Sequence, residues 1–347
     1  MKTSIKLCAA IMAVAMCCGL SSCKKDALND NQPFDDAEFY TVSLGMDGEI
    51  LEVTDEPLLR GSGEKDLYGI QVYSTPNKDL PEGQKTVWSN YAYGLFTTGK
   101  DLTINLMKGY RYKFVATMVV DGQEKLFSGS QKTSYLSPFT LSGMGSSWMK
   151  IGTQFDYQSA YYLSGLGRGY ATSIDGNHYN HPNLERFYGE LVDYIPGQHG
   201  NKAMIKMKRV AFGAKFHAKG KLATVGTLEA QITEAPKMLL DLTVSDKTMS
   251  DIFTFSNVAA AWADNNFTET IPVTLNMHKP DGSIFPLGTH QITFKRNKMT
   301  VVNVTIENES LAGQLGIEID DVDMTEDDDQ TNITDGEVVD TEVDTNA

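Results

Sequence analysis

The chain has 347 residues, of which 41% are hydrophobic, and a net charge of −15 from 30 basic and 45 acidic side chains. The acidity lies at the C-terminal end, because residues 299–347 hold 15 acidic residues and no basic one, whereas residues 23–298 hold 28 basic and 30 acidic residues. This balance lacks the basic footprint of a nucleic-acid-binding protein, and we exclude that class.

The first 22 residues predict a lipoprotein signal peptide. A basic start is followed by an apolar run from Leu7 to Leu20, which is too short to span a bilayer and has the usual length of a signal-peptide core. The stretch Leu20–Cys23 reads Leu-Ser-Ser-Cys, the pattern of lipoprotein signal peptidase: an aliphatic residue, two small residues and the cysteine that receives the lipid. We therefore predict that Cys23 is lipidated, with palmitate among the acyl chains, and anchors the protein to a membrane.

Cysteine usage agrees with this prediction. Three of the four cysteines lie in the leader, and the fourth is Cys23. The mature protein would then have no disulfide, no thiolate zinc site and no cysteine nucleophile. Its stability would have to come from apolar burial, for which the 325 residues after the leader suffice, with two domains as the favoured count.

Residues 23–36 are polar and have no hydrophobic period, so we interpret them as a flexible tether. Beyond the tether, apolar and polar residues alternate, which is typical of half-buried strands because their side chains point to alternate faces. This alternation predicts strands over residues 40–44, 70–73, 102–106, 110–120, 203–208, 212–217, 228–233, 238–244, 252–255, 271–277, 290–295 and 300–306.

Four Asp-Gly pairs predict hairpin turns, since a type I′ turn needs positive φ at both central residues. They occupy residues 47–48, 121–122, 175–176 and 281–282. The pair at 121–122 is the strongest hairpin prediction, because apolar segments flank it closely on both sides. Short helices are predicted at residues 182–190 and 257–264.

Many short strands with little helix predict an all-β fold with two β-sandwich domains. The acidic C-terminal residues contain few large apolar side chains and predict disorder. The expected organisation is a signal peptide (1–22), a tether (23–36), an N-terminal sandwich (37–222), a C-terminal sandwich (223–317) and a disordered acidic tail (318–347).

Catalytic and metal-binding motifs are weak. The sequence has no nucleophile elbow, P-loop or dinucleotide-binding glycine motif. His178 and His181 are three residues apart, but Pro182 favours a loop, and zinc would need further ligands; the acidic tail lacks the EF-hand spacing. Composition leaves open a carboxylate pair of glycosidase type among Asp156, Glu185, Glu190 and Asp193. We predict that the protein is not an enzyme and holds no metal or cofactor.

Tyrosines are frequent between residues 155 and 194. Aromatic faces near polar side chains suit stacking against sugar rings, and the candidate glycan contacts are Tyr161, Tyr162, Tyr170 and Tyr179. Tyrosine also packs well in strands and at sandwich edges, where its ring is buried and its hydroxyl reaches water. Packing is therefore the alternative interpretation of these four residues.

The segment Met204–Phe216, with the order Met-Ile-Lys-Met-Lys-Arg-Val-Ala running into a second alternating strand, resembles the fimbrillin-like lipoproteins of Gram-negative anaerobes. In that family, such a strand lies near the end of the N-terminal sandwich. The segment Pro57–Gly63, which contains Arg60, and the following Leu67–Tyr73 are similar to the family in their order. Residues 294–306 resemble the close of its C-terminal domain.

The resemblance implies a two-domain, transthyretin-like β-sandwich protein, anchored by lipid to the outer membrane and facing outward, that serves as a pilus subunit or adhesin. In the family, an arginine-specific protease cuts ahead of the core sandwich, the leading strand is lost, and a neighbouring subunit donates a strand to the groove. Carried over to this sequence, the cleavage site is Arg60, and the partners are other pilin subunits or further copies of this chain.

Two features leave alternatives open. The acidic tail departs from the family pattern and puts a C-terminal donor-strand role in doubt, although residues 336–343 show some apolar alternation. The Tyr-rich segment 155–194 supports a second hypothesis, a surface lipoprotein that binds host or dietary glycans.

Overall fold

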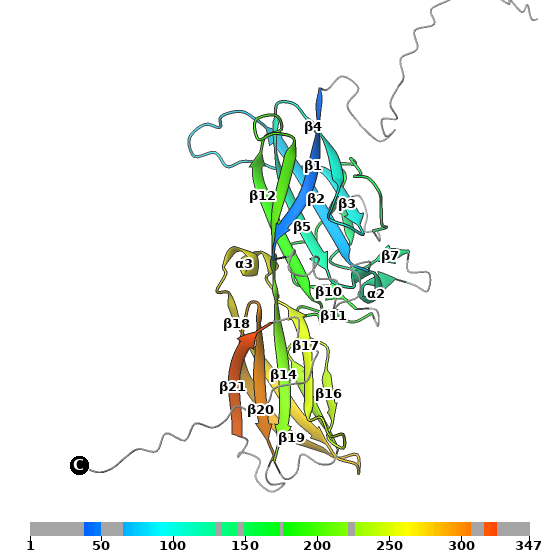
Figure 1. Ribbon diagram of the computed structural model, residues 1–347, viewed down its shortest axis with the longest axis vertical. Coiled ribbons are helices and arrows are strands. Elements are labelled where there is room, and N and C mark those ends of the chain that lie inside the picture. Colours follow the sequence, from blue (N-terminus) through cyan, green and yellow to red (C-terminus); the bar gives the residue numbers. More distant parts are fainter. Residues whose placement is uncertain are drawn as a thin grey trace, which may run out of the picture.

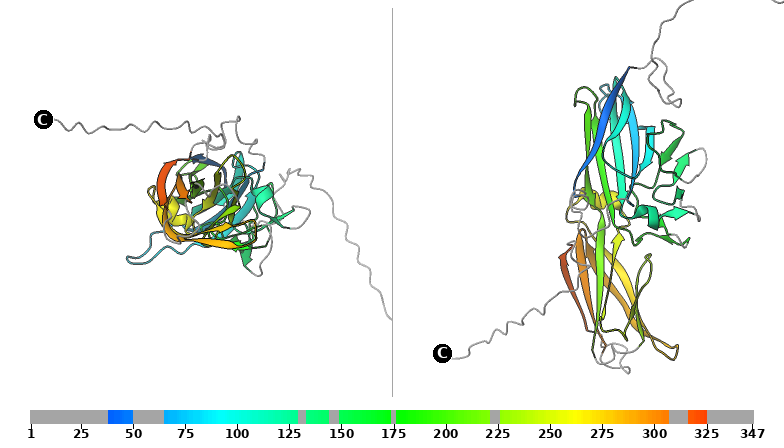
Figure 2. Two further views of the ribbon diagram at one scale, coloured as in Figure 1. Left: turned by 90° about the horizontal axis from the view of Figure 1, so that it is seen from below. Right: turned by 45° about the vertical axis from the view of Figure 1, so that its right-hand side comes forward.

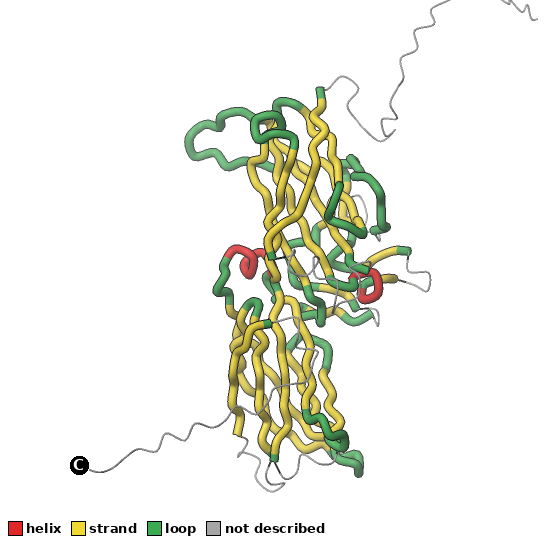
Figure 3. Tube along the Cα trace, in the orientation of Figure 1, coloured by secondary structure: helices red, strands yellow, loops and turns green. Residues whose placement is uncertain are grey.

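The computed structural model of the protein describes residues 38–49, 65–128, 133–143, 149–173, 176–220, 226–306 and 316–324. The molecule is elongated, with two β-domains stacked end to end (Figure 1). Strands dominate the described residues, and the two short helices lie near the level at which the domains meet (Figure 3). The predicted signal peptide, the whole tether (23–36) with Cys23, and Arg60 lie outside the described residues.

The N-terminal domain is built on a seven-stranded sheet with the order β3-β2-β5-β12-β13-β1-β4. Its strands are β1 (Phe39–Gly48), β2 (Leu67–Pro76), β3 (Ser89–Phe96), β4 (Leu102–Met107), β5 (Tyr110–Val119), β12 (Arg186–Tyr194) and β13 (Lys202–Arg209). β13 pairs with β12 at residues 208–209 and with β1 over residues 202–207. The sheet thus folds over, with β13, β1 and β4 facing the other strands (Figure 2).

An apolar core fills the space between these two layers. Leu44 of β1 and Ile104 of β4 belong to the same buried cluster as Ile70 of β2 and Phe114 of β5. All four side chains are at most 1% exposed. Because the side chains of a strand alternate between its faces, this cluster occupies one face of each strand.

Between β5 and β12 the chain makes a long excursion over the outer face of the sheet (Figure 2, right). It contains α2 (Gly122–Lys125), β6 (Phe127–Ser128), β7 (Ser134–Tyr135), β8 (Leu141–Gly143), β9 (Tyr161–Leu163), β10 (Ala171–Thr172) and β11 (His178–Tyr179). These strands form small two-stranded sheets. Apolar residues of the excursion, such as Phe139 and Leu166, join a second buried cluster with Val115 of the main sheet.

Two buried polar side chains of the main sheet hold this excursion. The side-chain oxygen of Gln71 accepts a hydrogen bond from the backbone N–H of Leu163 at 2.8 Å. The guanidinium of Arg186, which is 0% exposed, donates to the hydroxyl of Thr117 at 3.0 Å. It also donates to the carbonyl oxygens of Gly165, Leu166 and Arg168 at 3.2, 2.8 and 2.6 Å.

The C-terminal domain pairs two four-stranded sheets, with the orders β17-β14-β20-β21 and β16-β15-β18-β19. Its elements are β14 (Ala211–Lys219), β15 (Thr227–Ile232), β16 (Met238–Asp241), β17 (Thr248–Thr254), α3 (Val258–Ala263), β18 (Thr268–His278), β19 (Ile284–Lys295), β20 (Lys298–Thr305) and β21 (Gly316–Asp323). Phe212 lies at the centre of the core, with ring centroids 4.4 Å from Phe294 and 4.8 Å from Phe255.

This architecture confirms the predicted all-β fold with two sandwich-like domains. Each predicted strand overlaps an observed one, and α3 confirms the helix expected at residues 257–264, with the Asn257 side chain accepting from the Ala260 N–H at its start. The Asp-Gly pair at 281–282 lies in the turn between β18 and β19, as predicted.

Three local predictions are wrong. The Asp-Gly pair at 47–48 does not form a hairpin turn, because both residues belong to β1 and pair in parallel with β13. Residues 186–194 form β12 instead of a helix, because they pair with β5 and β13 on both sides and this tertiary pairing overrides the local signal at Pro182. The turn at residues 121–122 does not form a hairpin: Asp121 has positive φ (53°), but the chain continues into α2. β5 is instead flanked by β2 and β12.

Two expected boundaries differ from the observed elements. β13 ends in the N-terminal sheet at Arg209 and β14 begins in a C-terminal sheet at Ala211, so we propose Val210, and not residue 222, as the division between the domains. The alternation of the two strands is so similar that the sequence carries no sign of the change. The expected tail boundary at 318 falls inside β21, which pairs antiparallel with β20.

No helix within the described ranges has the length and apolar composition that crossing a bilayer requires.

Candidate functional site

Strand β1 forms the centre of the candidate site, because it lies between two other strands. It runs parallel to β13, from Ser43 opposite Lys202 to Gly48 opposite Met207. It runs antiparallel to β4 over Phe39–Leu44. β4 is an edge strand of the sheet, and β1 lies next to it. Without β1, both β13 and β4 would present unpaired backbone groups.

The inward side chains of β1 alternate along the strand. Val42, Leu44 and Met46 are 0%, 1% and 9% exposed and belong to the core of the N-terminal domain, whereas Thr41 and Ser43, on the opposite face of the strand, are exposed. Burial of each such apolar side chain stabilises a fold by roughly 1.5–3 kcal/mol. β1 therefore fills a row of three apolar positions that the rest of the domain leaves for it.

Two glycines show how closely β1 fits against β13. A Cβ atom at Gly45 would lie 2.8 Å from the sulfur of Met204. Gly48 has φ of +89°, and a Cβ atom there would lie 2.6 Å from the carbonyl oxygen of Met207. At Gly45 the flexible end of the Met204 side chain can move aside. At Gly48 the contact is with backbone and φ is positive, so a strand that takes the place of β1 in the same register needs glycine there.

The residue after β1 connects the two domains. The carboxylate of Glu49 accepts hydrogen bonds from the Arg296 guanidinium and from the backbone N–H of Arg209, each at 2.8 Å. Arg209 in turn pairs with Glu185 at 2.9 Å and donates to the side chain of Asn297 at 2.7 Å. Glu49 and Arg296 are 247 residues apart, and no local pattern could have predicted their contact.

The predicted cleavage and lipidation sites flank β1 in the sequence. Cys23 precedes β1, and Arg60 lies between the end of β1 at Gly48 and the start of β2 at Leu67. Both residues fall outside the described part of the chain, so their roles stay predictions. A cut after Arg60 would leave β1 covalently joined to Cys23 but held to the sheet by noncovalent contacts alone.

The four candidate tyrosines fall into two groups. Tyr161 and Tyr162 are consecutive residues of β9, and consecutive side chains of a strand point to opposite faces. Tyr170 and Tyr179 belong to the β10–β11 hairpin region, where the Tyr170 ring stacks on His178 with centroids 5.3 Å apart. The four tyrosines therefore belong to two separate parts of the excursion, and their role as glycan contacts stays a prediction.

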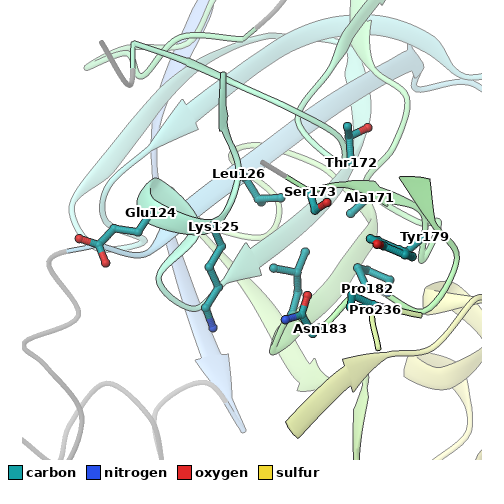
Figure 4. A pocket seen from close by; sticks show the side chains of 11 residues that line it. Glu124, Lys125, Leu126, Ala171, Thr172, Ser173, Tyr179, Pro182, Asn183 and Pro236 are labelled. Atoms are coloured by element: carbon teal, nitrogen blue, oxygen red, sulfur yellow. The ribbon is translucent and has the colours of Figure 1, made fainter. Parts of the chain in front are cut away.

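Tyr179 lines a hollow of about 320 Å³ near the domain junction (Figure 4). Leu126 and Leu184 contribute apolar side chains to it. The Tyr179 ring lies beside Pro236 of the C-terminal domain, while Lys125 enters from α2 on the other side (Figure 4). Its lining includes one aromatic residue, which is little for a surface that binds sugars by stacking.

The candidate carboxylates are engaged by different partners. Asp156 accepts from the Tyr93 hydroxyl at 3.0 Å, Glu185 pairs with Arg209 at 2.9 Å, Glu190 pairs with Lys113 at 2.7 Å, and Asp193 lies 3.6 Å from Arg111. These contacts account for the four groups as ion pairs and hydrogen bonds of the fold.

The two candidate histidines also have separate surroundings. His178 contacts the Tyr170 hydroxyl at 2.6 Å, whereas buried His181 lies 2.9 Å from the Thr233 carbonyl and 3.2 Å from Glu269. Within the described ranges, no group of three or more His, Cys, Asp or Glu side chains is arranged to hold a metal ion.

Glu269 belongs to the contact between the domains. Burial alone would raise its pKa, but hydrogen bonds from His181 and from the Ser256 hydroxyl, at 3.2 and 2.7 Å, lower the pKa of Glu269 overall. The carboxylate is therefore stabilised in its charged form by one residue from each domain.

No protein-family model matches the sequence, and no curated protein is detectably similar. Similar solved structures include a candidate cell adhesion protein from Bacteroides eggerthii (10% identity, TM-score 0.37, 85% of this chain and 98% of that chain). A candidate adhesin from Bacteroides thetaiotaomicron has 10% identity and TM-score 0.37, over 84% and 100% of the two chains. The fimbrial anchor protein Mfa2 from Porphyromonas gingivalis has 12% identity and TM-score 0.34, over 81% and 96%. At TM-scores this low, the fold assignment rests on the strand order and register described above.

Proposed function

We propose that the protein is a lipid-anchored subunit of a cell-surface fimbria, or an adhesin of the same construction, that assembles by exchange of strand β1. The position of β1 carries this proposal. It is the first described strand of the domain and lies between β13 and β4, and Arg60 stands between β1 and β2 in the sequence. Along the sequence, Cys23 comes first, then β1, then Arg60 and then the remaining strands. One cut after Arg60 therefore separates the lipid anchor and β1 from the rest of the protein.

The physical basis of the exchange is β-augmentation. Loss of β1 would expose backbone donors and acceptors on β13 and β4, together with the apolar positions filled by Val42, Leu44 and Met46. A donor strand with the same alternation would restore both the ladder and the core, with its side chains setting the register. The donor is another pilin subunit or a second copy of this chain.

The proposed location is the outer face of the outer membrane, through lipid on Cys23. Residues 23–37 join this anchor to the described N-terminal domain. A Cys23→Ala variant is expected to lose palmitate labelling and membrane association, whereas wild-type protein retains both until Arg60 is cut. A Cys23→Ala variant that still incorporates labelled palmitate would contradict the lipidation.

An arginine-specific protease tests the exchange. We expect cleavage of the mature protein after Arg60, release of the fragment that carries β1, and oligomers on size-exclusion chromatography. Arg60→Ala should stay uncut at this position and monomeric. Arg168→Ala, which removes an exposed arginine of the excursion, is the matched control and should behave as wild type.

A synthetic peptide with the sequence of residues 38–49 adds a second measurement. It should compete for the position between β13 and β4 that β1 leaves, which we call the β1 slot, and should suppress oligomers of the cleaved protein. A scrambled peptide should not. Cleaved protein that retains its β1 fragment and remains monomeric under mild denaturant would overturn the proposed function.

The alternative, a glycan-binding surface made by Tyr161, Tyr162, Tyr170 and Tyr179, has less support, because these residues are divided between two parts of the excursion.

A further inference from the structure

The outer face of the N-terminal sheet carries charged and aromatic side chains where the excursion ends. Tyr73 of β2 lies opposite Lys113 of β5, and Val115 of β5 lies opposite Glu190 of β12. Tyr188 is two residues before Glu190 on the same strand. Because residues two apart share a face, these five side chains project from one side of three adjacent strands, away from the core of the sandwich.

A hollow of about 260 Å³ lies over these side chains. Its floor is the strand face just described, its wall is the end of β9 with Leu163, Ser164 and Gly167, and Trp88 lines it from the segment before β3. Three aromatic residues therefore line one small hollow: Tyr73, Trp88 and Tyr188. Trp88 and Tyr73 are partly exposed, while Tyr188 is 2% exposed.

The polar groups of the hollow form one connected set. Glu190 accepts a hydrogen bond from the Tyr188 hydroxyl at 2.5 Å and pairs with the Lys113 ammonium at 2.7 Å. Burial and the contact with Glu190 raise the pKa of Tyr188, so its hydroxyl stays a neutral donor. The Glu190 and Lys113 side chains remain 16% and 25% exposed. An ammonium has three donors and a carboxylate about four acceptor sites, so both groups retain capacity for a ligand.

The wall of the hollow is held in place from beneath. Gln71 fixes the backbone of Leu163, and Arg186 holds the carbonyls of Gly165, Leu166 and Arg168. Both anchoring side chains are 0% exposed. Fixing the wall before a ligand arrives reduces the entropy lost on binding.

We propose that this hollow binds the ring of a neutral sugar at the end of a glycan. Glu190 would repel an acidic ligand and Lys113 would repel a basic one, and the two charges already neutralise each other in an ion pair. A sugar hydroxyl both donates and accepts, so adjacent hydroxyls can bind the carboxylate and the ammonium together. The apolar C–H face of the ring would pack on Trp88 or Tyr73, which offer large apolar surfaces with a polar edge.

The size of the hollow limits the ligand. Pockets for drug-sized ligands have volumes of about 300–1,000 Å³, and this hollow of about 260 Å³ falls just below that range, so it accommodates one ring with the remaining glycan outside. Of the four tyrosines suggested by the sequence, Tyr162 lies near Tyr73 of this hollow. The pKa of Tyr73 is raised by burial, by Glu190 and, to a smaller extent, by Tyr162. This site is separate from the β1 slot, and its function does not require strand exchange.

The test is binding of the intact mature protein to an array of oligosaccharides that end in neutral hexoses, fucose, N-acetylhexosamines or sialic acid. We expect binding to a subset of the neutral termini. Titration with the corresponding free monosaccharide, followed by saturation-transfer NMR, should give the same preference. Trp88→Ala and Glu190→Gln should each weaken binding at least tenfold.

Tyr170→Ala is the matched control, because it removes an exposed aromatic ring outside this hollow, and it should bind as wild type. Trp88 is partly exposed and belongs to neither buried cluster, so Trp88→Ala should unfold at the same urea concentration as wild type. A blank array for folded wild-type protein, binding restricted to sialylated termini, or unchanged binding by Trp88→Ala would each overturn the proposal. None of these outcomes bears on cleavage at Arg60.

Discussion

At the scale of single residues, buried polar side chains hold together parts of the molecule that apolar packing alone would not place. Arg186 is the clearest case, because its guanidinium is fully buried and its donors are directed to one hydroxyl and three carbonyls. Burial lowers the pKa of Arg186 to about 9, so the group remains charged at neutral pH. Its bonds attach the excursion to the sheet and shape the hollow above Glu190.

Glu269 gives a prediction for acid stability. Its pKa in the folded protein is below the usual glutamate value because hydrogen bonds from His181 and Ser256 outweigh burial. A carboxylate with a lowered folded pKa contributes stability above its unfolded pKa and loses it as pH falls through the folded pKa. We expect Glu269→Gln to be less stable than wild type at pH 6, with the difference shrinking below about pH 4.5.

Urea unfolding at several pH values measures this effect. Glu82→Gln, at an exposed position between β2 and β3, serves as the control and should follow wild type throughout. A Glu269→Gln deficit that stays constant down to pH 3 would mean that the carboxylate charge is not the cause.

At the scale of elements, β1 is bound on both sides and through its apolar face. Leu44→Ala removes one of its three buried apolar side chains, and such core truncations cost about 2–5 kcal/mol. We expect this loss in urea unfolding of the uncut chain. Ser43→Ala, on the exposed face of the same strand, should leave the unfolding midpoint unchanged.

The same pair of variants reports on exchange. Leu44→Ala should release the β1 fragment faster after cleavage at Arg60, because its contacts with the core are weaker, and Ser43→Ala should release it at the wild-type rate. Equal release by both variants would show that the apolar face of β1 does not hold the strand in its slot.

β21 is the second element with a specific prediction. It covers one side of β20, and Asp321 both pairs with Lys295 and accepts from the Thr300 hydroxyl at 3.1 Å. A chain that ends at residue 306 should therefore unfold at lower urea concentration than a chain that ends at residue 324. The latter is the control, since it lacks only residues 325–347. Identical midpoints would show that β21 adds no stability to the C-terminal sheet.

How well an element could be predicted from sequence depends on how many of its faces are buried. β1 has one buried and one exposed face, and the alternation of Val42, Leu44 and Met46 predicted it. β12 was missed because residues 186–189 are buried on both faces, so no alternation appears. β12 also contains Arg186. Arginine is usually exposed, and nothing in the sequence indicates the three carbonyl groups that allow this one to be buried.

The candidate sites also differ in how far they could be predicted from the sequence. The sequence and its family resemblance predicted that the strand ahead of Arg60 would matter. They did not predict the hollow above Glu190, because Tyr73, Trp88 and Lys113 come from separate segments that only the pairing of β2, β5 and β12 brings together. Counting tyrosines in one segment therefore gave a set of aromatic residues different from the set that lines this hollow.

At the scale of the whole molecule, the junction between the domains depends on a residue that precedes the predicted cleavage site. Glu49 accepts from Arg296, whose side chain is 6% exposed. Glu49→Gln keeps the shape but removes the charge, and loss of a charge-assisted hydrogen bond costs about 1.5–3 kcal/mol. We expect the variant to show two separate calorimetric transitions, one for each domain, in place of a more cooperative unfolding.

Glu38→Gln is the matched control, because Glu38 stands at the other end of β1 in an exposed pair with Lys108, and it should unfold as wild type. A single unchanged transition for Glu49→Gln would mean that the junction is held by other contacts, such as that of His181 with Glu269.

The direction of β1 has a mechanical consequence. β1 runs along β13 and β4 over six residue pairs on each side, so a donor strand in this slot would be pulled along its own axis when a filament is stretched. Under such a load the ladder bonds on both sides resist in shear and share the force, instead of opening one after another from an end. A filament joined in this way would resist rupture under flow even if each strand exchanged readily at rest.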